Sequence, residues 1–239
     1  MGFFDFIFPK YCVSCKKLGS HLCSDCFSYL SFDVNGICLV CGRPSIDGLT
    51  HLYCRKRYAI DGVFSALNYK GPVKRLIYQF KYKPYLTDLK TVISDLFYES
   101  LIQKEELNKI LNQALPAGRQ GDAKIFVPIP LYKSKEKSRG YNQAEILAEE
   151  LGRRLGVEVQ NLLERTKNTK SQVGLKKEER KENMEGAFKV ISDKRQATRD
   201  KIIFLVDDVL TTGSTLLEAA SVLKRKGAKR VYGLTLAKD

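Results

Sequence analysis

The sequence predicts an α/β protein with a doubly wound, mostly parallel sheet and a small cysteine-rich module at its N-terminus. From residue 63 onward, short apolar runs alternate with helical patterns. Residues 202–206 are five apolar residues without alternation, which is typical of a strand buried on both faces of a parallel sheet. All seven cysteines lie between residues 12 and 54. We therefore divide the 239-residue chain into a module at 1–57 and an α/β domain at 58–239.

The cysteines are spaced like zinc ligands. Three Cys-x2-Cys pairs precede a fourth pair in which His51 replaces the first cysteine. An odd number of clustered cysteines is unlike a secreted disulfide framework, whereas eight ligands suit two closed tetrahedral zinc sites. We expect two structural Zn²⁺ ions, one held by Cys12, Cys15, Cys23 and Cys26 and the other by Cys38, Cys41, His51 and Cys54. Interleaved pairing (first pair with third, second with fourth) and free thiols stay open as alternatives.

The first half of the α/β domain is expected to contain one strand and two helices. The strand covers 63–69, and the first helix covers 72–82 with Pro72 in its first turn. A longer amphipathic helix is predicted at 88–103, capped by Thr87, and its pattern allows an extension to 111. Residues 115–123 break the periodicity and predict a surface loop.

The second half predicts the remaining strands of the sheet. A strand at 124–129 is followed by a helix at 142–155, where Asn142 and Glu145 resemble a capping box, and by a strand at 157–163. Polar residues 164–186 predict a long loop or a loose helical flap, and such loops are usually functional. Strands at 187–191, 201–206 and 230–237 complete the sheet, with a helix at 214–226 that Gly227 ends.

The segment after the strand at 202–206 predicts a sugar-phosphate site. Asp207 and Asp208 follow the strand, a loop rich in hydroxyls runs from Thr211 to Thr215, and a helix begins there. Amides and hydroxyls at a helix N-terminus suit a phosphate dianion, and the preceding acids are placed for vicinal ribose hydroxyls. An ordinary strand, turn and helix with an acidic cap is the plain alternative. Neither a P-loop nor a dinucleotide-binding glycine motif is present.

Residues 206–215, Val-Asp-Asp-Val-Leu-Thr-Thr-Gly-Ser-Thr, resemble the phosphoribosyl pyrophosphate signature of type I phosphoribosyltransferases. Segments 127–131, 139–144, 172–175, 180–183 and 186–188 are similar to the ComF family, a phosphoribosyltransferase-like group linked to competence and DNA uptake. The resemblance implies a type I phosphoribosyltransferase-like fold behind a double zinc ribbon. It departs from the family at His51, where family members carry a cysteine.

The same resemblance implies roles for individual residues. Asp207 and Asp208 would contact the ribose hydroxyls and serve catalysis. The 5′-phosphate would be held by Thr211, Thr212, Gly213, Ser214 and Thr215. The loop at 131–140 resembles the family's pyrophosphate loop, and we assign Lys133 and Arg139 to the ligand; Lys135 and Lys137 add charge there. Basic residues of the flap, Lys176, Lys177, Arg180 and Lys181, could close over the site.

The expected function is Mg²⁺-dependent binding of phosphoribosyl pyrophosphate, extended to ribosyl phosphate transfer, a glycosyltransferase activity, if an acceptor exists. The only histidines, His21 and His51, lie in the module, so no general base is evident. The alternative is a non-catalytic accessory of DNA uptake that binds single-stranded DNA and has a sensory or vestigial pocket. A net charge of +14, from 41 basic and 27 acidic residues, favours polyanionic partners. Basic and aromatic residues mix at 69–85, as in single-strand binders, although a solvated basic surface would look the same.

The sequence also bears on location. No stretch approaches the ~20 apolar residues of a membrane helix, and the aromatic run at 3–8 is too short for a signal-peptide core. We expect no membrane insertion and a cytoplasmic protein, with the aromatic run packed on the domain that follows.

Overall fold

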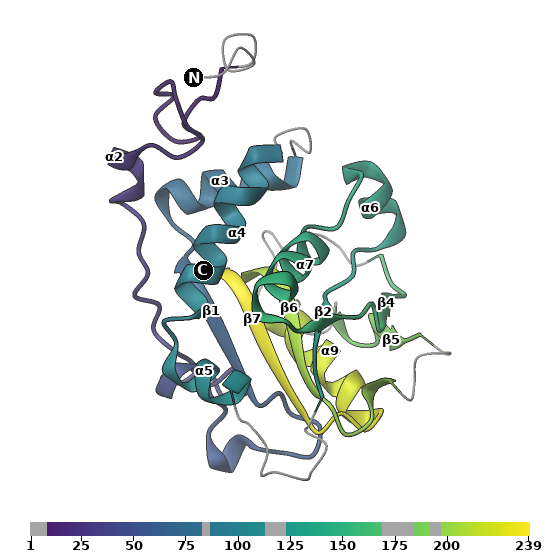
Figure 1. Cartoon of the computed structure of the whole chain (residues 1–239). Helices are drawn as coiled ribbons and strands as arrows, with labels where there is room; N and C mark the ends of the chain where they lie inside the picture. Colours follow the sequence, from purple (N-terminus) through teal and green to yellow (C-terminus); the bar gives the residue numbers. More distant parts are fainter. Residues whose placement is uncertain (1–8, 83–86, 113–122, 169–183, 192–196) are drawn as a thin grey trace.

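A computed structural model describes residues 9–82, 87–112, 123–168, 184–191 and 197–239. Its centre is a five-stranded sheet with the order β1-β7-β6-β2-β3, in which every neighbouring pair is parallel (Figure 1). The strands are β1 (Gly62–Asn68), β2 (Lys124–Pro128), β3 (Glu158–Val159), β6 (Ile202–Leu210) and β7 (Arg230–Lys238). The prediction of a doubly wound, mostly parallel sheet is confirmed.

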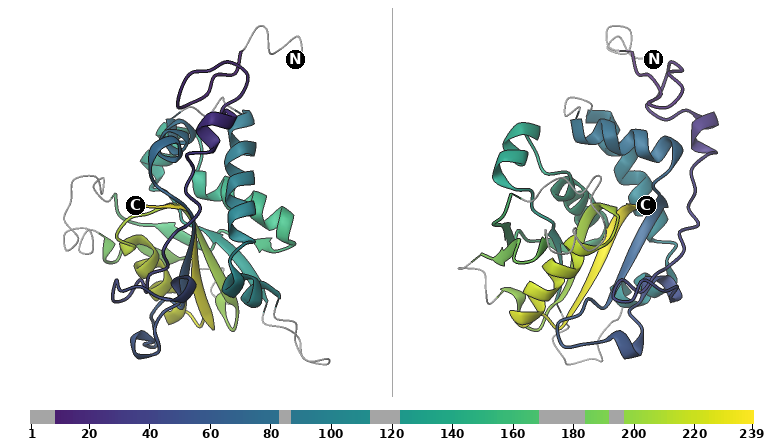
Figure 2. Two further views of the ribbon diagram at one scale, coloured as in Figure 1. Left: turned by 90° about the vertical axis from the view of Figure 1, so that its left-hand side faces the viewer. Right: turned by 180° about the vertical axis from the view of Figure 1, so that it is seen from behind.

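Helices cover both faces of this sheet, so the fold has three layers (Figure 2). One face carries α3 (Gly71–Tyr82), α4 (Thr87–Leu101), α5 (Glu105–Asn112) and α7 (Gln143–Leu155). The other face carries α9 (Ser214–Arg225). Neighbouring residues of a strand point to opposite faces, so Phe204 joins the first core and Leu205 the second. The apolar run at 202–206 is therefore uninterrupted because it fills both cores.

Two helix ends differ from the sequence expectation. The long helix stops at Leu101, and α5 is separate, because the chain turns at 102–104 so that Leu107 and Ile110 reach the first core. The side chain of Asn142 caps α7 by accepting a hydrogen bond from the Ala144 N–H at 3.2 Å. Glu145 does not complete a capping box, because its carboxylate accepts from Asn161 at 2.6 Å instead.

Two expected strands do not belong to the main sheet as predicted. The strand expected at 157–163 is two short strands, β3 and β4 (Leu163–Arg165). The strand expected at 187–191 is β5 (Phe188–Val190), which pairs antiparallel with β4 in a separate sheet. β5 lies against α9, where its Phe188 and Val190 enter the second core. Apolar alternation alone does not say which sheet a strand joins.

The N-terminal module runs along the β1 side of the sheet (Figure 1). It is tied to the α/β domain at several points: Arg75 donates to the Ser14 carbonyl at 2.5 Å, Asn68 to the Ser31 hydroxyl at 2.8 Å and Lys238 to the Asn35 carbonyl at 2.7 Å. Three expectations lie outside the described residues: the packing of 3–8, the loop at 115–122 and the flap over 169–183. Among the described helices, none is both long and apolar enough to cross a bilayer.

Candidate functional site

The sheet has a topological switch point between β2 and β6. After β2 the chain crosses one face of the sheet through α7 and returns as β3, on the side of β2 away from β6. After β6 it crosses the opposite face through α9 and returns as β7, on the side of β6 away from β2. In open α/β sheets a crevice lies at the carboxyl ends of such strands, and ligands bind there. The segments that follow the two strands are α6 (Lys133–Arg139) and the loop 211–213 before α9. The pyrophosphate loop expected at 131–140 is thus largely a short helix.

The acid pair lies on an extension of β6 beyond its partner β2. Pairing with β2 ends at Pro128 and Val206, whereas pairing with β7 continues through Asp207 with Thr235 to Leu210 with Lys238. The strand is therefore longer than expected and includes both acids, because β7 continues to pair with the backbone of this part of β6. This extension puts Asp207 and Asp208 beyond the end of β2, at the carboxyl edge of the sheet where such folds bind their ligands.

The start of α9 has the features of a phosphate-binding helix terminus. Gly213 precedes the helix in the left-handed conformation, with φ 76°, and no side chain caps the helix. Thr212 and Ser214 bring their hydroxyls to 2.9 Å from each other across this turn. An uncapped helix start lined with hydroxyls is suited to an anion.

The acid pair shares a cationic neighbour, Lys81. The Oδ2 of Asp208 lies 2.8 Å from the Nζ of Lys81 in the last turn of α3, and the two side chains are only 13% and 22% exposed. The Oδ1 of Asp207 accepts a hydrogen bond from the Asp208 N–H at 2.8 Å. Asp207 is attracted by Lys81 as well, and to a smaller extent by Arg165 of β4 (Leu163–Arg165). The sequence analysis missed Lys81 and Arg165 as site residues.

The surroundings of Asp207 disfavour its ionised form. Burial, together with the negative charge of Asp208, raises the pKa of Asp207 to about 7, against the opposing effects of the Asp208 N–H, Lys81 and Arg165. Burial alone would lower the pKa of the Lys81 ammonium, but the carboxylates of Asp208 and Asp207 outweigh it and raise that pKa. Lys81 is therefore charged at neutral pH, whereas Asp207 exchanges its proton near neutral pH.

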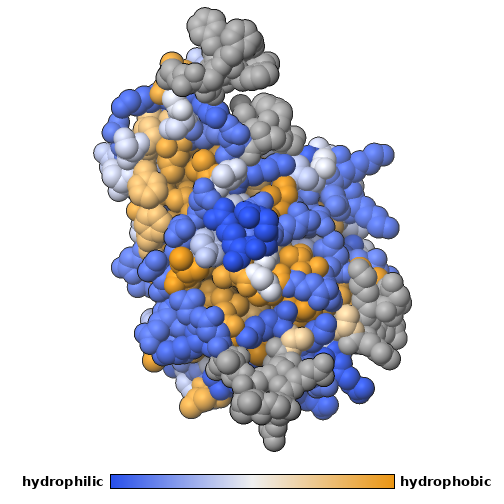
Figure 3. Space-filling model, in the orientation of Figure 1, coloured by the Kyte–Doolittle hydropathy of each residue, from blue (hydrophilic) through white to orange (hydrophobic). Residues whose placement is uncertain are grey.

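Basic side chains converge opposite the acids. Arg139 at the end of α6 donates to the Gln143 amide oxygen at 3.0 Å, and its guanidinium lies 5.5 Å from the ring centre of Tyr82. Burial lowers the pKa of Lys135, and the positive charges of Arg165 and Arg139 add to this effect. Lys133 is exposed at the start of α6. Hydrophilic side chains cover this region of the surface around α6 (Figure 3).

Affinity for ribose 5-phosphate, which has both the hydroxyls and the phosphate that the site would bind, is expected to rise with pH up to about 7. Asp207 must lose its proton to accept hydrogen bonds from two hydroxyls, and its pKa is about 7. Below that value the dissociation constant should increase by up to about tenfold per pH unit. Calorimetric titrations across this range measure it, and a flat profile above the pKa of the ligand's own phosphate would contradict the prediction.

Replacing Lys81 by methionine is expected to move the midpoint of this pH profile upward. Lys81 lowers the pKa of Asp207, so its removal makes the carboxylate harder to ionise. The phosphate of the ligand ionises in the same way in experiments with the wild type and with Lys81→Met. A difference between the two midpoints therefore comes from the protein. Glu149→Gln, which removes an exposed carboxylate from α7, is the matched control and should leave the midpoint in place.

The structure groups the eight candidate zinc ligands in the sequential order. Cys12, Cys15, Cys23 and Cys26 form one group and Cys38, Cys41, His51 and Cys54 the other, and within each group all ligand atoms lie within 4.8 Å of one another. The interleaved alternative does not correspond to these groups.

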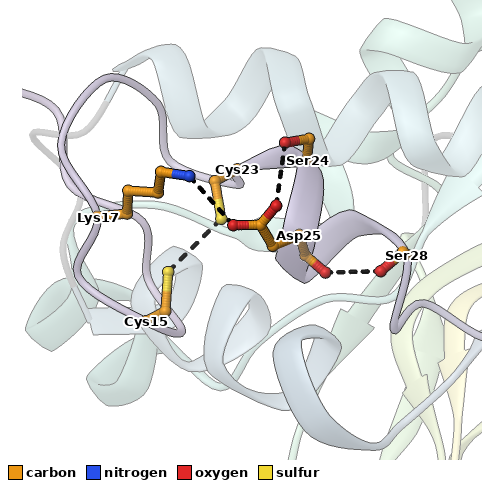
Figure 4. A network of polar contacts seen from close by, with 6 residues as sticks. All are labelled: Cys15, Lys17, Cys23, Ser24, Asp25 and Ser28. Atoms are coloured by element: carbon orange, nitrogen blue, oxygen red, sulfur yellow. Dashed lines mark hydrogen bonds and ion pairs between the residues drawn. The ribbon is translucent and has the colours of Figure 1, made fainter.

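The geometry of both groups suits tetrahedral zinc. Zinc–sulfur bonds of about 2.3 Å put the sulfurs of a tetrahedral site about 3.8 Å apart. The Sγ atoms of Cys15 and Cys23 are 3.5 Å apart (Figure 4), and Cys41 Sγ lies 3.4 Å from His51 Nδ1. The other ring nitrogen of His51 lies 3.0 Å from the Pro44 carbonyl, which can accept its proton and leave Nδ1 as the ligand.

The two halves of the module repeat one local structure. The Cys12 N–H donates to the Lys17 carbonyl at 2.9 Å, and the Cys38 N–H donates to the Arg43 carbonyl at 2.9 Å. Isolated bridges join Tyr11 to Leu18 and Ile37 to Pro44 in the same relation. The short elements that follow are α2 (Ser24–Phe27) in the first half, and η1 (Ile46–Gly48) and η2 (Leu52–Cys54) in the second. The module is therefore an internal repeat, in agreement with its cysteine spacing.

Comparisons with known proteins match both parts of the chain. Residues 137–239 match the phosphoribosyl transferase domain, and residues 3–56 match the double zinc ribbon domain. Competence protein F of Haemophilus influenzae is 38% identical over 115 residues, which are 47% of this chain and 50% of that protein. DNA utilization protein YhgH of Escherichia coli is 29% identical over 232 residues, covering 93% of this chain and 94% of the relative. Competence protein ComFC of Bacillus subtilis is 29% identical over 241 residues, covering 93% of this chain and 86% of the relative.

Proposed function

Because this chain is a homologue of competence proteins F and ComFC, with a phosphoribosyl transferase domain behind a double zinc ribbon, we propose that it binds phosphoribosyl pyrophosphate with Mg²⁺. The site is the crevice at the carboxyl ends of β2 and β6. One observation carries the proposal: a half-buried acid pair lies near the end of β6, a short loop before the uncapped start of α9, and basic side chains lie nearby.

In this proposal each part of the ligand meets the group that complements it. The carboxylates of Asp207 and Asp208 accept hydrogen bonds from the two ribose hydroxyls, while Arg139 and Lys133 face the pyrophosphate. The 5′-phosphate lies at the start of α9, against Thr211, Thr212, Gly213, Ser214 and Thr215. Mg²⁺ would neutralise negative charge on the pyrophosphate and ribose oxygens, because this hard cation prefers oxygen ligands.

The catalytic form of the proposal is transfer of ribosyl phosphate. The bond from C1′ to the pyrophosphate oxygen breaks, its electron pair leaves with pyrophosphate, and the lone pair of an acceptor forms the new bond to C1′. The acceptor then loses its proton to the released pyrophosphate or to water. Arg139, Lys135 and Arg165 would stabilise the leaving charge, and the carboxylates of the acid pair would lie near the positive ribose ring. Pyrophosphate release in a screen of bases and amines identifies the acceptor.

A calorimetric titration with phosphoribosyl pyrophosphate tests the binding proposal. We expect one ligand per chain in the presence of Mg²⁺ and much weaker binding with chelator. Absence of binding at saturating Mg²⁺, in protein shown to be folded, would refute the proposal.

A second candidate function is that of a single-strand-binding accessory in DNA uptake. The relatives named for competence and DNA utilization suggest this role, and the surface of α3 favours it. The rings of Tyr78 and Tyr82 are 59% and 56% exposed, with centroids 4.9 Å apart, and Lys74 lies 5.8 Å from the Tyr69 ring. Exposed rings beside cations can stack on bases and follow phosphates. Here the nucleotide pocket would bind phosphoribosyl pyrophosphate without turnover.

Anisotropy of a labelled oligothymidine tests this second function. We expect affinity that falls steeply with salt, and a further loss in Tyr78→Ala. Tyr29→Ala is the matched control, because that ring is 76% exposed but belongs to the N-terminal module. Equal losses in both variants would show that α3 is not the DNA-binding surface.

Under either function we also propose that the protein is cytoplasmic, because its seven cysteines are candidate zinc ligands and a reducing compartment keeps them from forming disulfides.

A further inference from the structure

The side chain of Leu39, in the second half of the zinc module, touches Gly213 of the candidate phosphate-binding segment 211–215. Leu39 lies between Cys38 and Cys41, two members of the second ligand group, and is only 6% exposed. A Cβ atom added to Gly213 would overlap the Leu39 side chain. The leucine therefore packs directly on the glycine that precedes α9.

The turn that carries Leu39 is closed by a backbone hydrogen bond. Around it, the Gly42 N–H donates to the Cys38 carbonyl at 2.7 Å, and Gly42 has the left-handed φ of 75° that this turn requires. The rest of this half is attached to the segment just before β1, because the Thr50 hydroxyl donates to the Ile60 carbonyl at 2.7 Å. A metal ion on the second ligand group would tighten the turn that carries Leu39.

Leu39 also belongs to the core of the α/β domain. It joins the second core together with Val63 of β1 and Leu216 in the first turn of α9. The first ligand group is placed differently: Val13, which lies between Cys12 and Cys15 as Leu39 lies between Cys38 and Cys41, joins the first core on the opposite face of the sheet. The two candidate zinc sites are thus unequal in their relation to the phosphate loop.

We propose that the second half of the zinc module is part of the phosphate site, with Leu39 as a positioning residue. Leu39 holds residues 211–215, which are the loop and the start of α9, in their binding conformation. Gly213 has no side chain to restrict its backbone, so an outside contact must do so. Zinc at the second group fixes Leu39, Leu39 fixes Gly213, and the loop then receives the phosphate without further ordering. The inference rests on the proposed function and adds a means of regulation, since zinc and ligand would strengthen each other's binding by the same factor.

Hydrogen exchange in the full chain tests the structural link without any ligand. Cys41→Ser removes a ligand of the second group, and Cys15→Ser is the matched loss from the first group. We expect faster exchange at 211–217 in Cys41→Ser than in Cys15→Ser, with the strands of the sheet unchanged in both. Equal exchange at 211–217 would overturn the inference whatever the protein binds.

Leu39→Ala tests the same link with both zinc ions retained. We expect two equivalents of zinc, faster exchange at 211–217 and a rise of roughly fivefold or more in the dissociation constant for ribose 5-phosphate, with Leu39→Met restoring most of the affinity. Unchanged affinity in Leu39→Ala would overturn the inference while leaving the proposed function intact. If the wild-type chain bound no phosphoribosyl pyrophosphate, the proposed function would fail instead, and the exchange result would still decide whether the ribbon orders the loop.

Discussion

Replacing Asp207 and Asp208 together by asparagine is expected to abolish measurable binding of phosphoribosyl pyrophosphate. Both acids lie on β6 beyond the end of its pairing with β2, and the Asp208 carboxylate lies 2.8 Å from the Lys81 ammonium. Hydrogen bonds to a charged group contribute about 1.5–3 kcal/mol each, so losing both acceptors should raise the dissociation constant by about a hundredfold or more. Calorimetry with Mg²⁺ present measures the change. Glu149→Gln is the control, and undiminished affinity in the double variant would remove the acids from the site.

The single variant Asp207→Asn is expected to be more stable than the wild type at high pH. The pKa of this carboxyl is about 7 in the folded protein against an ordinary value of 3.8, so the folded state holds the proton more tightly than the unfolded state. The stability that this provides is complete below the ordinary value and is lost as pH rises through about 7. The stability difference between Asp207→Asn and wild type should therefore grow across this interval, by about 1 kcal/mol or more. Urea unfolding at several pH values measures it, and a constant difference would contradict the pKa.

Removal of zinc is expected to unfold the N-terminal module. The described part of the module has a small apolar core of its own, and structural zinc contributes about 10–16 kcal/mol in isolated zinc-finger peptides. Metal analysis should find two equivalents per chain, and a strong chelator should abolish the thermal transition of the module. Less than one equivalent in the purified chain would refute the two-site assignment.

His51 allows this assignment to be tested one site at a time. His51→Ala should lose the second equivalent only, whereas His51→Cys, which rebuilds a four-cysteine group, should keep both. Loss of both ions in His51→Ala would show that the two sites depend on each other.

Much of the fold followed from local patterns. The run at 202–206 identified a strand buried on both faces, and the cysteine spacing anticipated the two ligand groups. Where the sequence analysis was wrong, the deciding contacts were distant in the chain. The strand at 188–190 pairs with β4 rather than with the main sheet, and α5 breaks from α4 so that its apolar side chains reach the first core.

The sequence by itself determined the acid pair, the hydroxyl-lined loop and the zinc ligands, because each is a short segment whose chemistry depends on its own spacing. Only the tertiary structure decided which charges lie near the acids and which side chain packs against the loop. Lys81, Arg165 and Leu39 come from three other elements, and no local pattern marks a residue whose partner lies across the fold. Burial then sets the ionisation of Asp207, because the cost of a charge depends on the surrounding atoms rather than on the neighbouring residues in the chain.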